Sequence, residues 1–340
     1  MRATTLHAPY EIRFTDVPDP EITAPTDAIV KVTAACICGS DLWNYRGEND
    51  VKPGMTIGHE CLGEIVAVGG DVRDFKVGDH VIVPFCHCDN TCANCRAGVQ
   101  SACVNFGVTV TGQGEYAKVN QADGSLVRLP GAPDAEAIPA LLTLTDVMAT
   151  GWHAAVAAGV TPGSTAVVVG DGAVGLCAVL AASVMGAERV VAMSRHESRQ
   201  KIATSFGATH VVAERADEGI DAILELTAGI GADAVLECVG TAQSMQTAFH
   251  VARAGSTVGV VGVPHGVELP VRRMFGKNIG LAGGIAPVRR YLPELLQLVQ
   301  DGRIDPGPVF DLTLPMDRVA EGYAAMDERR AIKVALTPIS

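Results

Sequence analysis

Two short segments in the first half of the chain carry side chains that bind metal ions in proteins. Cys38 lies in a Cys-Gly-Ser-Asp segment, and a Gly-His-Glu segment with His59 and Glu60 follows about twenty residues later. Thiolate, imidazole and carboxylate groups are usual zinc ligands, and three protein ligands with an open fourth position are typical of catalytic zinc. The pattern therefore predicts a catalytic zinc centre whose open position accepts water or a substrate oxygen.

A second candidate zinc site lies in a single stretch of chain. Asp89, Cys92, Cys95 and Cys103 follow one another with intervals of two, two and seven residues. Four ligands on one loop are typical of a closed, structural zinc site. Five of the ten cysteines fall within the 18 positions from Cys86 to Cys103. Because the N-terminus lacks the apolar run of a secretion signal, this cluster favours metal binding over a disulfide framework.

A glycine-rich turn marks a candidate nucleotide site. Residues 170–175 read Gly-Asp-Gly-Ala-Val-Gly, which fits the GxGxxG pattern between an expected strand and an expected helix. The first glycine allows the tight turn, the second lets the backbone approach a pyrophosphate, and the third allows close packing of helix on strand. The N–H groups at the helix N-terminus favour phosphate binding. The pattern predicts a dinucleotide site that includes Gly170, Gly172, Ala173, Val174 and Gly175.

The end of the next expected strand distinguishes between the two nicotinamide dinucleotides. An NAD site places Asp or Glu there, about 20 residues after the glycines, to bind the ribose 2′-hydroxyl. Here the strand ends in Ser-Arg-His, without an acid. We expect Ser194 and Arg195, with His196 and Arg199, to bind a 2′-phosphate, which favours NADP. The alternative is an NAD enzyme that uses Glu197.

The elements that must position these residues change character near residue 150. Short β-rich runs come first, and strands that alternate with helices follow, which predicts βαβ units in a doubly wound parallel sheet. The expected early strands are Ile29–Thr33, Gly63–Val68 and Val77–Pro84. The later ones are Thr165–Val169, Arg189–Met193, His210–Val212, Ala232–Cys238 and Ser256–Val261, with helices at Val174–Met185 and Glu197–Phe206. A helix at Arg290–Val299 and a strand at Ile332–Leu336 close the chain.

Composition limits the class of protein. At about 150 residues per domain, 340 residues predict two domains. A net charge of -12 and an aromatic content of 4% disfavour nucleic-acid binding, which needs a basic face and stacking rings. No apolar run reaches the roughly 18 residues of a membrane span. We therefore expect a soluble cytoplasmic protein that binds neither nucleic acid nor membrane.

Together these features resemble the zinc-dependent medium-chain alcohol dehydrogenases, over essentially the whole chain. The resemblance rests on Cys38-Gly39-Ser40-Asp41, Gly58-His59-Glu60, the cysteine-rich loop, Asp146 with Thr150-Gly151-Trp152-His153, and Gly170 to Gly175. It implies an α/β fold in which a Rossmann doubly wound parallel sheet is inserted into a GroES-like β-barrel catalytic domain. The implied domains are residues 1–149 and 286–340 for the catalytic domain and 150–285 for the NAD(P)-binding domain.

The resemblance also implies roles for individual residues. Cys38, His59 and Asp146 are the expected catalytic zinc ligands, and Glu60 is the carboxylate that coordinates zinc when substrate is absent. Ser40 is expected to take the substrate proton. Asp41 is expected to orient His59, and Cys36 to serve only in packing. The expected cofactor-binding set also includes Thr150, Cys238 and Lys333.

Two positions depart from the pattern of the family. Relatives commonly have a fourth cysteine where this chain has Asp89; a carboxylate also binds zinc, and Cys88 or Cys86 is the substitute if the loop is rearranged. A loop without metal, or with an oxidised cysteine pair, is a further alternative. Trp43 occupies the position of a histidine that passes the proton onward in many relatives. The proton route then shortens to Ser40 and the cofactor ribose.

The expected activity is reversible hydride transfer between a primary or secondary alcohol and NADP(H), through a zinc-bound alkoxide. The alternatives are a polyol, sugar or amino-alcohol dehydrogenase of the same family that uses NAD(H), a zinc-independent quinone reductase, and a non-enzymatic nucleotide-binding protein. The ligand set Cys38, His59 and Asp146 disfavours the last two. The partners expected are a small alcohol or carbonyl compound and further copies of the chain, in a homotetramer or homodimer.

Overall fold

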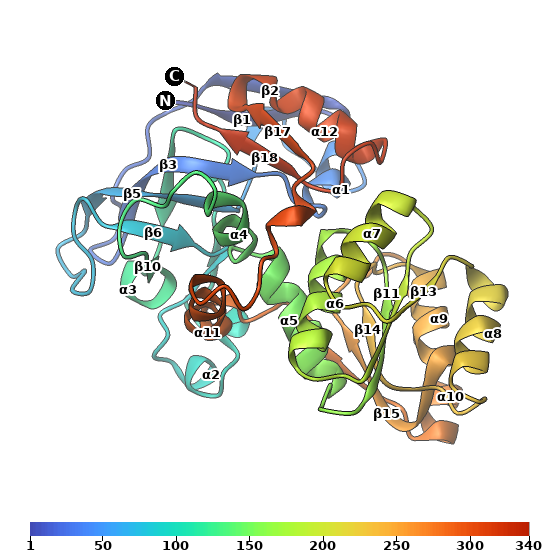
Figure 1. The fold of residues 1–340 in the computed structure, drawn as a ribbon. Coiled ribbons are helices and arrows are strands. Elements are labelled where there is room, and N and C mark those ends of the chain that lie inside the picture. The colour runs from blue at the N-terminus through green and yellow to red at the C-terminus, as the bar shows by residue number, and fades with distance from the viewer. Residues whose placement is uncertain (340) are drawn as a thin grey trace. The chain divides into compact units, whose positions relative to one another are not determined.

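The computed structural model describes residues 1–339, and the chain divides into two compact units (Figure 1). The first unit comprises Met1–Asp146 and Pro287–Ser340, and the second comprises Val147–Ala286. The second unit is thus an insertion in the sequence of the first. No helix among the described residues is long and apolar enough to cross a membrane.

The first unit is built around an antiparallel-rich sheet of seven strands. β3 lies at its centre, because it pairs antiparallel with β5, with β9 and with β18. The sheet comprises β3 (Ala28–Cys36), β5 (Cys61–Val68), β6 (His80–Val83), β9 (Tyr116–Val119), β10 (Val127–Arg128), β17 (Leu312–Pro315) and β18 (Val334–Thr337). Smaller sheets are formed by β1 (Arg2–Ala8), β2 (Glu11–Asp16) and β4 (Met55–Thr56), and by β7 (Cys86–His87) and β8 (Gly107–Val108).

Short helices surround these strands. They are α1 (Asp41–Tyr45), α2 (Ala93–Arg96), α3 (Ala122–Ser125), α4 (Ile138–Thr143), α11 (Val288–Gln300) and α12 (Val319–Asp327). The alternating inward positions of β3, such as Val30 and Val32, are buried in a core that also takes Leu336 from β18 and Tyr323 from α12. The C-terminal segment therefore completes the core that the N-terminal segment begins.

The second unit is a six-stranded parallel sheet with helices on both faces. Its strand order is β13-β12-β11-β14-β15-β16, the doubly wound order of dinucleotide-binding domains. The strands are β11 (Thr165–Val169), β12 (Arg189–Met193), β13 (His210–Val212), β14 (Ala232–Glu237), β15 (Ala252–Val260) and β16 (Gly280–Gly283). The helices are α5 (Val147–Ala158), α6 (Ala173–Val184), α7 (Glu197–Ser205), α8 (Ala216–Leu226), α9 (Ala242–Val251) and α10 (Val271–Lys277).

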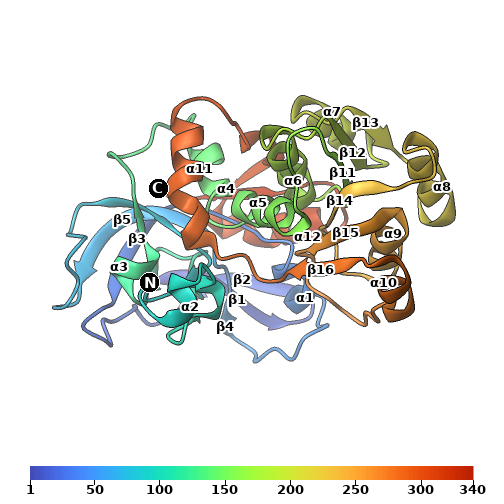
Figure 2. The same ribbon diagram turned by 90° about the horizontal axis from the view of Figure 1, so that it is seen from below.

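Burial on both faces explains the apolar strands of this sheet. α5 and α6 lie against one face and α8 and α9 against the other, and β14, β15 and β16 follow one another across the sheet (Figures 1 and 2). Ala166, Val167 and Val168 of β11 are consequently fully buried. Gly186 and Gly207 take the positive φ that follows a helix end, at 89° and 101°, and lead into the next strand.

Candidate functional site

The ladder between β3 and β5 brings the first metal-ligand residues together. Ala35 at the end of β3 pairs with Cys61 at the start of β5. Cys38 lies two residues after the end of β3, and His59 and Glu60 immediately precede β5, so the antiparallel pairing places both segments at one end of the ladder. Asp146 joins them as the last residue before the second unit begins.

The four donor groups fit a zinc ion. The ligand atoms of Cys38, His59, Glu60 and Asp146 all lie within 4.8 Å of one another. Asp146 Oδ2 is 3.4 Å from Cys38 Sγ and 3.5 Å from His59 Nε2. Ligand atoms on one tetrahedral zinc are about 3.3–3.8 Å apart, given bonds of about 2.0–2.3 Å. The structure thus brings together the residues predicted to form the catalytic zinc site.

Electrostatics in this cluster favour a bound cation. Burial raises the pKa of the Cys38 thiol to about 12, and the nearby carboxylates of Asp146 and Glu60 add to the effect. Burial by itself lowers the pKa of His59, but the charges of Asp41 and Cys38 and the hydrogen bonds of Asp146 and Asp41 raise it well above its usual value. Such buried acidic groups retain protons unless a metal ion replaces them, which is why metal binding releases protons.

Asp41 fixes the orientation of His59. Its Oδ1 lies 3.3 Å from His59 Nδ1, so that Nε2 faces the other donors. Its Oδ2 accepts hydrogen bonds from Cys38 N at 3.1 Å, from Gln113 Nε2 at 3.1 Å and from the Tyr323 hydroxyl at 3.4 Å. The contact of Asp41 with His59 matches the expectation from the sequence. Gln113 and Tyr323 were not expected here, because they belong to no motif and come from a loop and from α12.

Ser40 lies beside the donor cluster. Its hydroxyl donates to Cys38 Sγ at 3.1 Å, and Ser40 is the residue immediately before α1. Trp43 follows within α1. The position of Ser40 is compatible with a hydroxyl that exchanges a proton with a substrate oxygen, and this role remains a prediction.

A buried ion pair holds Glu60. Lys333 Nζ lies 2.9 Å from Oε1 and 2.8 Å from Oε2 of Glu60, and it also donates to the Ile37 carbonyl at 3.2 Å. The Cys36 thiol donates to Glu60 Oε2 at 2.6 Å, so Cys36 does more than pack. All three side chains are fully buried. The pairing of β18 with β3 places Lys333 here, while its predicted contact with the cofactor remains a prediction.

The cysteine-rich loop forms a second donor cluster. The ligand atoms of Asp89, Cys92, Cys95 and Cys103 lie within 4.8 Å of one another. Backbone N–H groups, from Val104 and Cys95 first, lower the pKa of Cys92 to about 7, which favours the thiolate that zinc binds. The Sγ atoms of Cys92 and Cys103 are 4.0 Å apart, as free thiols.

The Asp89 carboxylate is oriented by the loop itself. Burial raises its pKa, but hydrogen bonds from the N–H groups of Thr91 and Cys92 and from Asn105 outweigh burial and lower it. Oδ1 accepts from Thr91 N and Cys92 N at 2.8 Å each, and Oδ2 accepts from Asn105 Nδ2 at 2.9 Å. Of the substitutes considered above, Cys88 packs against the same cysteines but donates to the Gly124 carbonyl at 3.3 Å, and Cys86 lies in β7. The geometry favours Asp89 as the fourth donor.

The glycine-rich turn has the backbone that a pyrophosphate needs. Gly170 has a φ of 122°, and Gly172 ends the turn as the residue before α6. A Cβ atom on Gly175 would lie 2.1 Å from the Gly170 carbonyl oxygen, which confirms that this glycine is required for close packing. A Cβ on Gly172 would meet no protein atom within 4 Å, so space is open where the backbone would approach a phosphate. The turn therefore fits a dinucleotide.

The residues expected to bind a 2′-phosphate gather at the end of β12, but several are engaged with Asp171. Ser194 is fully buried and donates to Asp171 Oδ2 at 2.9 Å. Arg199 donates to Asp171 Oδ1 at 3.3 Å, and Arg215 lies 3.9 Å from Oδ2. Sequence analysis missed Arg215, which precedes α8 and carries no motif.

The other cofactor residues have varied surroundings. Arg195 is exposed, and His196 is the residue before α7. Glu197, the alternative ribose ligand, is exposed and forms an ion pair with Lys201 at 2.8 Å. Cys238 follows β14, and its N–H donates to the Val169 carbonyl at the end of β11. Thr150 is buried in α5.

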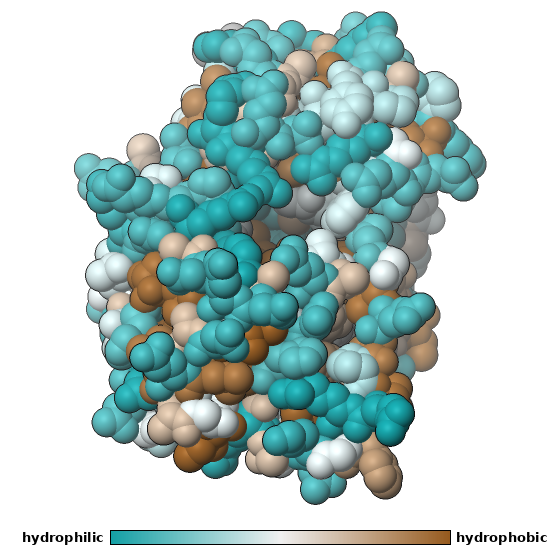
Figure 3. All heavy atoms as spheres, turned by 90° about the vertical axis from the view of Figure 1, so that its right-hand side faces the viewer, coloured by the Kyte–Doolittle hydropathy of each residue, from teal (hydrophilic) through white to brown (hydrophobic). Residues whose placement is uncertain are grey.

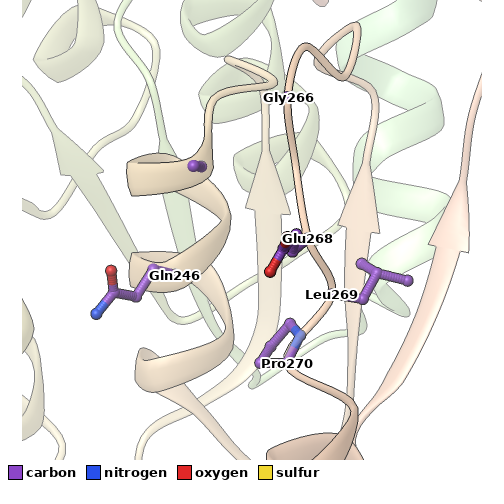
Figure 4. Close-up of a pocket in the computed structure, with 6 residues that line it drawn as sticks. Gln246, Gly266, Glu268, Leu269 and Pro270 are labelled. Atoms are coloured by element: carbon purple, nitrogen blue, oxygen red, sulfur yellow. The ribbon is translucent and has the colours of Figure 1, made fainter.

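A pocket that the sequence did not indicate lies elsewhere in the second unit. It has a volume of about 400 Å³ and is formed by α9 and the loop before α10 (Figure 4). Gln246 comes from the helix, and Glu268 and Pro270 come from the loop. Its lining is completed by Ala242, Gly266 and Leu269.

Comparisons with known proteins agree with both units. Residues 24–131 match the alcohol dehydrogenase GroES-like domain, and residues 173–301 match the zinc-binding dehydrogenase family. A probable zinc-binding alcohol dehydrogenase of Mycobacterium tuberculosis is 39% identical over 97% of this chain and 86% of its own length. A zinc-type alcohol dehydrogenase of Aspergillus flavus is 34% identical over 98% of this chain and 80% of its own.

A solved structure of an alcohol dehydrogenase is also similar to this chain over its whole length. The alcohol dehydrogenase TADH from Thermus sp. ATN1 has a TM-score of 0.90 at 32% identity, with 100% of both chains covered. A dinucleotide-binding sheet inserted into a unit that carries a Cys-His-Asp donor set defines a zinc-type dehydrogenase. The chain belongs to the zinc-dependent medium-chain alcohol dehydrogenase family, whose members are oxidoreductases. The predicted fold class, a Rossmann sheet inserted into a GroES-like catalytic domain, is confirmed.

The two glycines of the turn should respond differently to alanine. Gly175→Ala forces a methyl group against the Gly170 carbonyl and should lower the free energy of unfolding by about 1–3 kcal/mol. Gly172→Ala meets no protein atom and should leave stability within about 0.5 kcal/mol, while weakening the binding of a nicotinamide dinucleotide. Thermal unfolding and fluorescence titration with NADH and NADPH measure the two effects. Equal stability of the two variants would contradict the packing assigned to Gly175.

Substitution of Lys333 should lower the free energy of unfolding, because it leaves a buried charge unpaired. Lys333→Met leaves the Glu60 carboxylate buried without its ammonium partner and should destabilise the first unit by about 3–5 kcal/mol. The double variant Lys333→Met with Glu60→Gln removes both charges and should recover part of the loss. Denaturant unfolding followed by circular dichroism measures both variants. A double variant no more stable than the single one would argue against a buried ion pair.

Proposed function

We propose that this protein is a zinc-dependent alcohol dehydrogenase that transfers hydride reversibly between a primary or secondary alcohol and NADP(H). The observation that carries the proposal is the convergence of Cys38, His59, Glu60 and Asp146 within 4.8 Å of one another, beside the Ser40 hydroxyl. The alcohol dehydrogenases among its relatives support the same reaction class.

The chain's own residues have distinct tasks in this reaction. Cys38, His59 and Asp146 would hold the metal, and the thiolate and carboxylate would offset its two positive charges. Zinc, when bound, supplies a Lewis acid that polarises the substrate oxygen and lowers the pKa of its hydroxyl. In the oxidation direction, Ser40 Oγ would accept the proton of the substrate hydroxyl while its own hydroxyl proton passes on to the cofactor ribose, and the reverse transfers would return the proton in the reduction direction. Asp41 keeps His59 in the orientation that directs Nε2 toward the metal position.

Glu60 and the dinucleotide site complete the proposed machinery. The Lys333 ammonium and the Cys36 thiol fix the Glu60 carboxylate at the edge of the donor set, where it is available as an alternative ligand. In the second unit, the turn from Gly170 to Gly175 binds the pyrophosphate. A nicotinamide dinucleotide held there would supply the hydride chemistry, and the chain's part is to bind and orient it.

The surroundings of β12 support NADP(H) as the cofactor. Ser194, Arg195 and Arg199 supply one hydroxyl and two guanidinium groups near the strand end, and guanidinium groups bind phosphate in a bidentate manner. Glu197, the only nearby acid on α7, lies next to Lys201 in an exposed ion pair. A polyol, sugar or amino-alcohol dehydrogenase that uses NAD(H) is the second candidate, because the Asp171 carboxylate lies against Ser194.

The edge of the parallel sheet supports a homodimer or homotetramer. β16 is the last strand in the order, and an unpaired edge strand is a template for a second strand. Leu281 on this strand is 43% exposed, and Phe275 on the preceding helix is 87% exposed. Large exposed apolar groups near one edge favour association. Figure 3 shows one face of the molecule, on which hydrophobic residues lie among hydrophilic ones, mostly in the lower half of the view.

The zinc content of variants should show which of the two donor clusters holds which zinc ion. Cys38→Ser or His59→Ala should remove one zinc ion per chain and abolish turnover, while the Kd for NADPH changes less than about twofold. Cys95→Ser is the matched comparison, because it should remove the other zinc ion and reduce stability without removing a catalytic ligand. Elemental analysis, alcohol oxidation assays and NADPH titration measure these effects. Full turnover by Cys38→Ser protein without zinc would overturn the proposed mechanism.

The cofactor proposal predicts a selective effect of Arg195. Arg195→Ala should raise the KM for NADP(H) about tenfold or more, because a charge-assisted hydrogen bond to the 2′-phosphate is lost. The KM for NAD(H), which has no such phosphate, should change less than about twofold. Steady-state kinetics with both cofactors measure the difference. Equal changes would show that Arg195 does not bind the 2′-phosphate.

A further inference from the structure

The carboxylate of Asp171 occupies an anion-binding position at the end of β12. The buried Ser194 hydroxyl donates to it at 2.9 Å, and Arg199 and Arg215 approach it at 3.3 and 3.9 Å. These three groups come from the end of β12, from α7 and from the residue before α8. Asp171 itself lies in the glycine-rich turn, between β11 and α6.

This arrangement has the chemistry of a phosphate site that is already filled by a carboxylate. Hydroxyl and guanidinium donors are the groups that bind a phosphate monoester. The side chains of Arg199 and Asp171 are 12% and 14% exposed, so solvent screens their attraction less than at an open surface. Arg199 and Arg215 carry two positive charges beside the single negative charge of Asp171.

The same carboxylate also replaces the acid that β12 lacks. An acid at this strand end accepts a hydrogen bond from the ribose 2′-hydroxyl of NAD and repels the 2′-phosphate of NADP. The strand ends in Ser194 and Arg195, without an acid, but the turn brings Asp171 to the same place. The site therefore contains one feature that favours NAD(H) and several that favour NADP(H).

We propose that Asp171 and Arg215 are opposing determinants of cofactor preference. Asp171 weakens the binding of NADP(H), because it engages Ser194, Arg199 and Arg215 and repels the 2′-phosphate. Arg215 is a further ligand of that phosphate. This inference rests on the proposed function, in that the glycine-rich turn must bind a nicotinamide dinucleotide.

The test compares the binding of NADPH and NADH to the same protein, by fluorescence titration of the full chain. Asp171→Asn retains an oxygen that accepts from Ser194 but removes the charge, and it should raise the ratio of NADPH to NADH affinity about tenfold. Arg215→Ala should lower that ratio about tenfold. Because the ratio is measured on one preparation, a fraction of misfolded protein affects both cofactors equally.

Asp233→Asn is the matched control. Asp233 accepts from Thr165 N at 2.7 Å at the start of β11, at the opposite end of the strand from Asp171. The same substitution there should leave the affinity ratio within about twofold of wild type.

The outcomes separate this inference from the proposed function. If Asp171→Asn leaves the ratio of NADPH to NADH affinity unchanged while Arg195→Ala lowers it, the proposed role of Asp171 is overturned and NADP(H) remains the cofactor. A wild-type protein that prefers NADH, with a tenfold shift toward NADPH in Asp171→Asn, would support the inference and overturn the NADP(H) preference. A wild-type protein that binds neither dinucleotide would overturn both.

Discussion

The antiparallel ladder that joins β5, β3 and β18 is the constraint on which the metal-ligand cluster depends. Cys38, Glu60 and Lys333 are far apart in sequence, and each lies at or next to the end of one of these strands. A one-residue slip of either register would turn every side chain of the slipped strand to the opposite face of the sheet. The apolar residues of β3, including Val30 and Val32, are buried in the core and so fix the register. Core packing thereby sets the position of the candidate ligands.

The buried charges beside this ladder orient a side chain more than they stabilise the fold. A buried ion pair such as Glu60 with Lys333 regains by attraction only about what it loses in desolvation, and apolar replacements are often as stable. The pair instead gives the carboxylate one orientation at the edge of the donor set, with the Cys36 thiol as its other partner. The second cluster needs no such support, because Asp89 and its three cysteine partners lie on one loop whose backbone N–H groups orient them.

Local patterns in the sequence predicted much of this structure, and long-range pairings account for most of what was missed. β11 and β12 have the predicted bounds, since burial on both faces demands an uninterrupted apolar run. β15 begins at Ala252, earlier than predicted, because its exposed first half has no apolar pattern. The residues of the two donor clusters were predicted because they lie in motifs, and the structure brings them together. Gln113, Tyr323 and Arg215 were missed, since single polar residues acquire partners only through the topology.

The parallel sheet explains how the proposed determinants of cofactor preference come together. Asp171, Ser194 and Arg215 follow three adjacent strands, β11, β12 and β13. Parallel strands all end at one edge of the sheet, so the first residues after each strand meet even though dozens of residues separate them in sequence. All three residues lie after the strands, outside the ladders. Substitution of the charged residues Asp171 and Arg215 can therefore change which ligand binds without changing the fold, since function depends on such a site and not on the sheet that supports it.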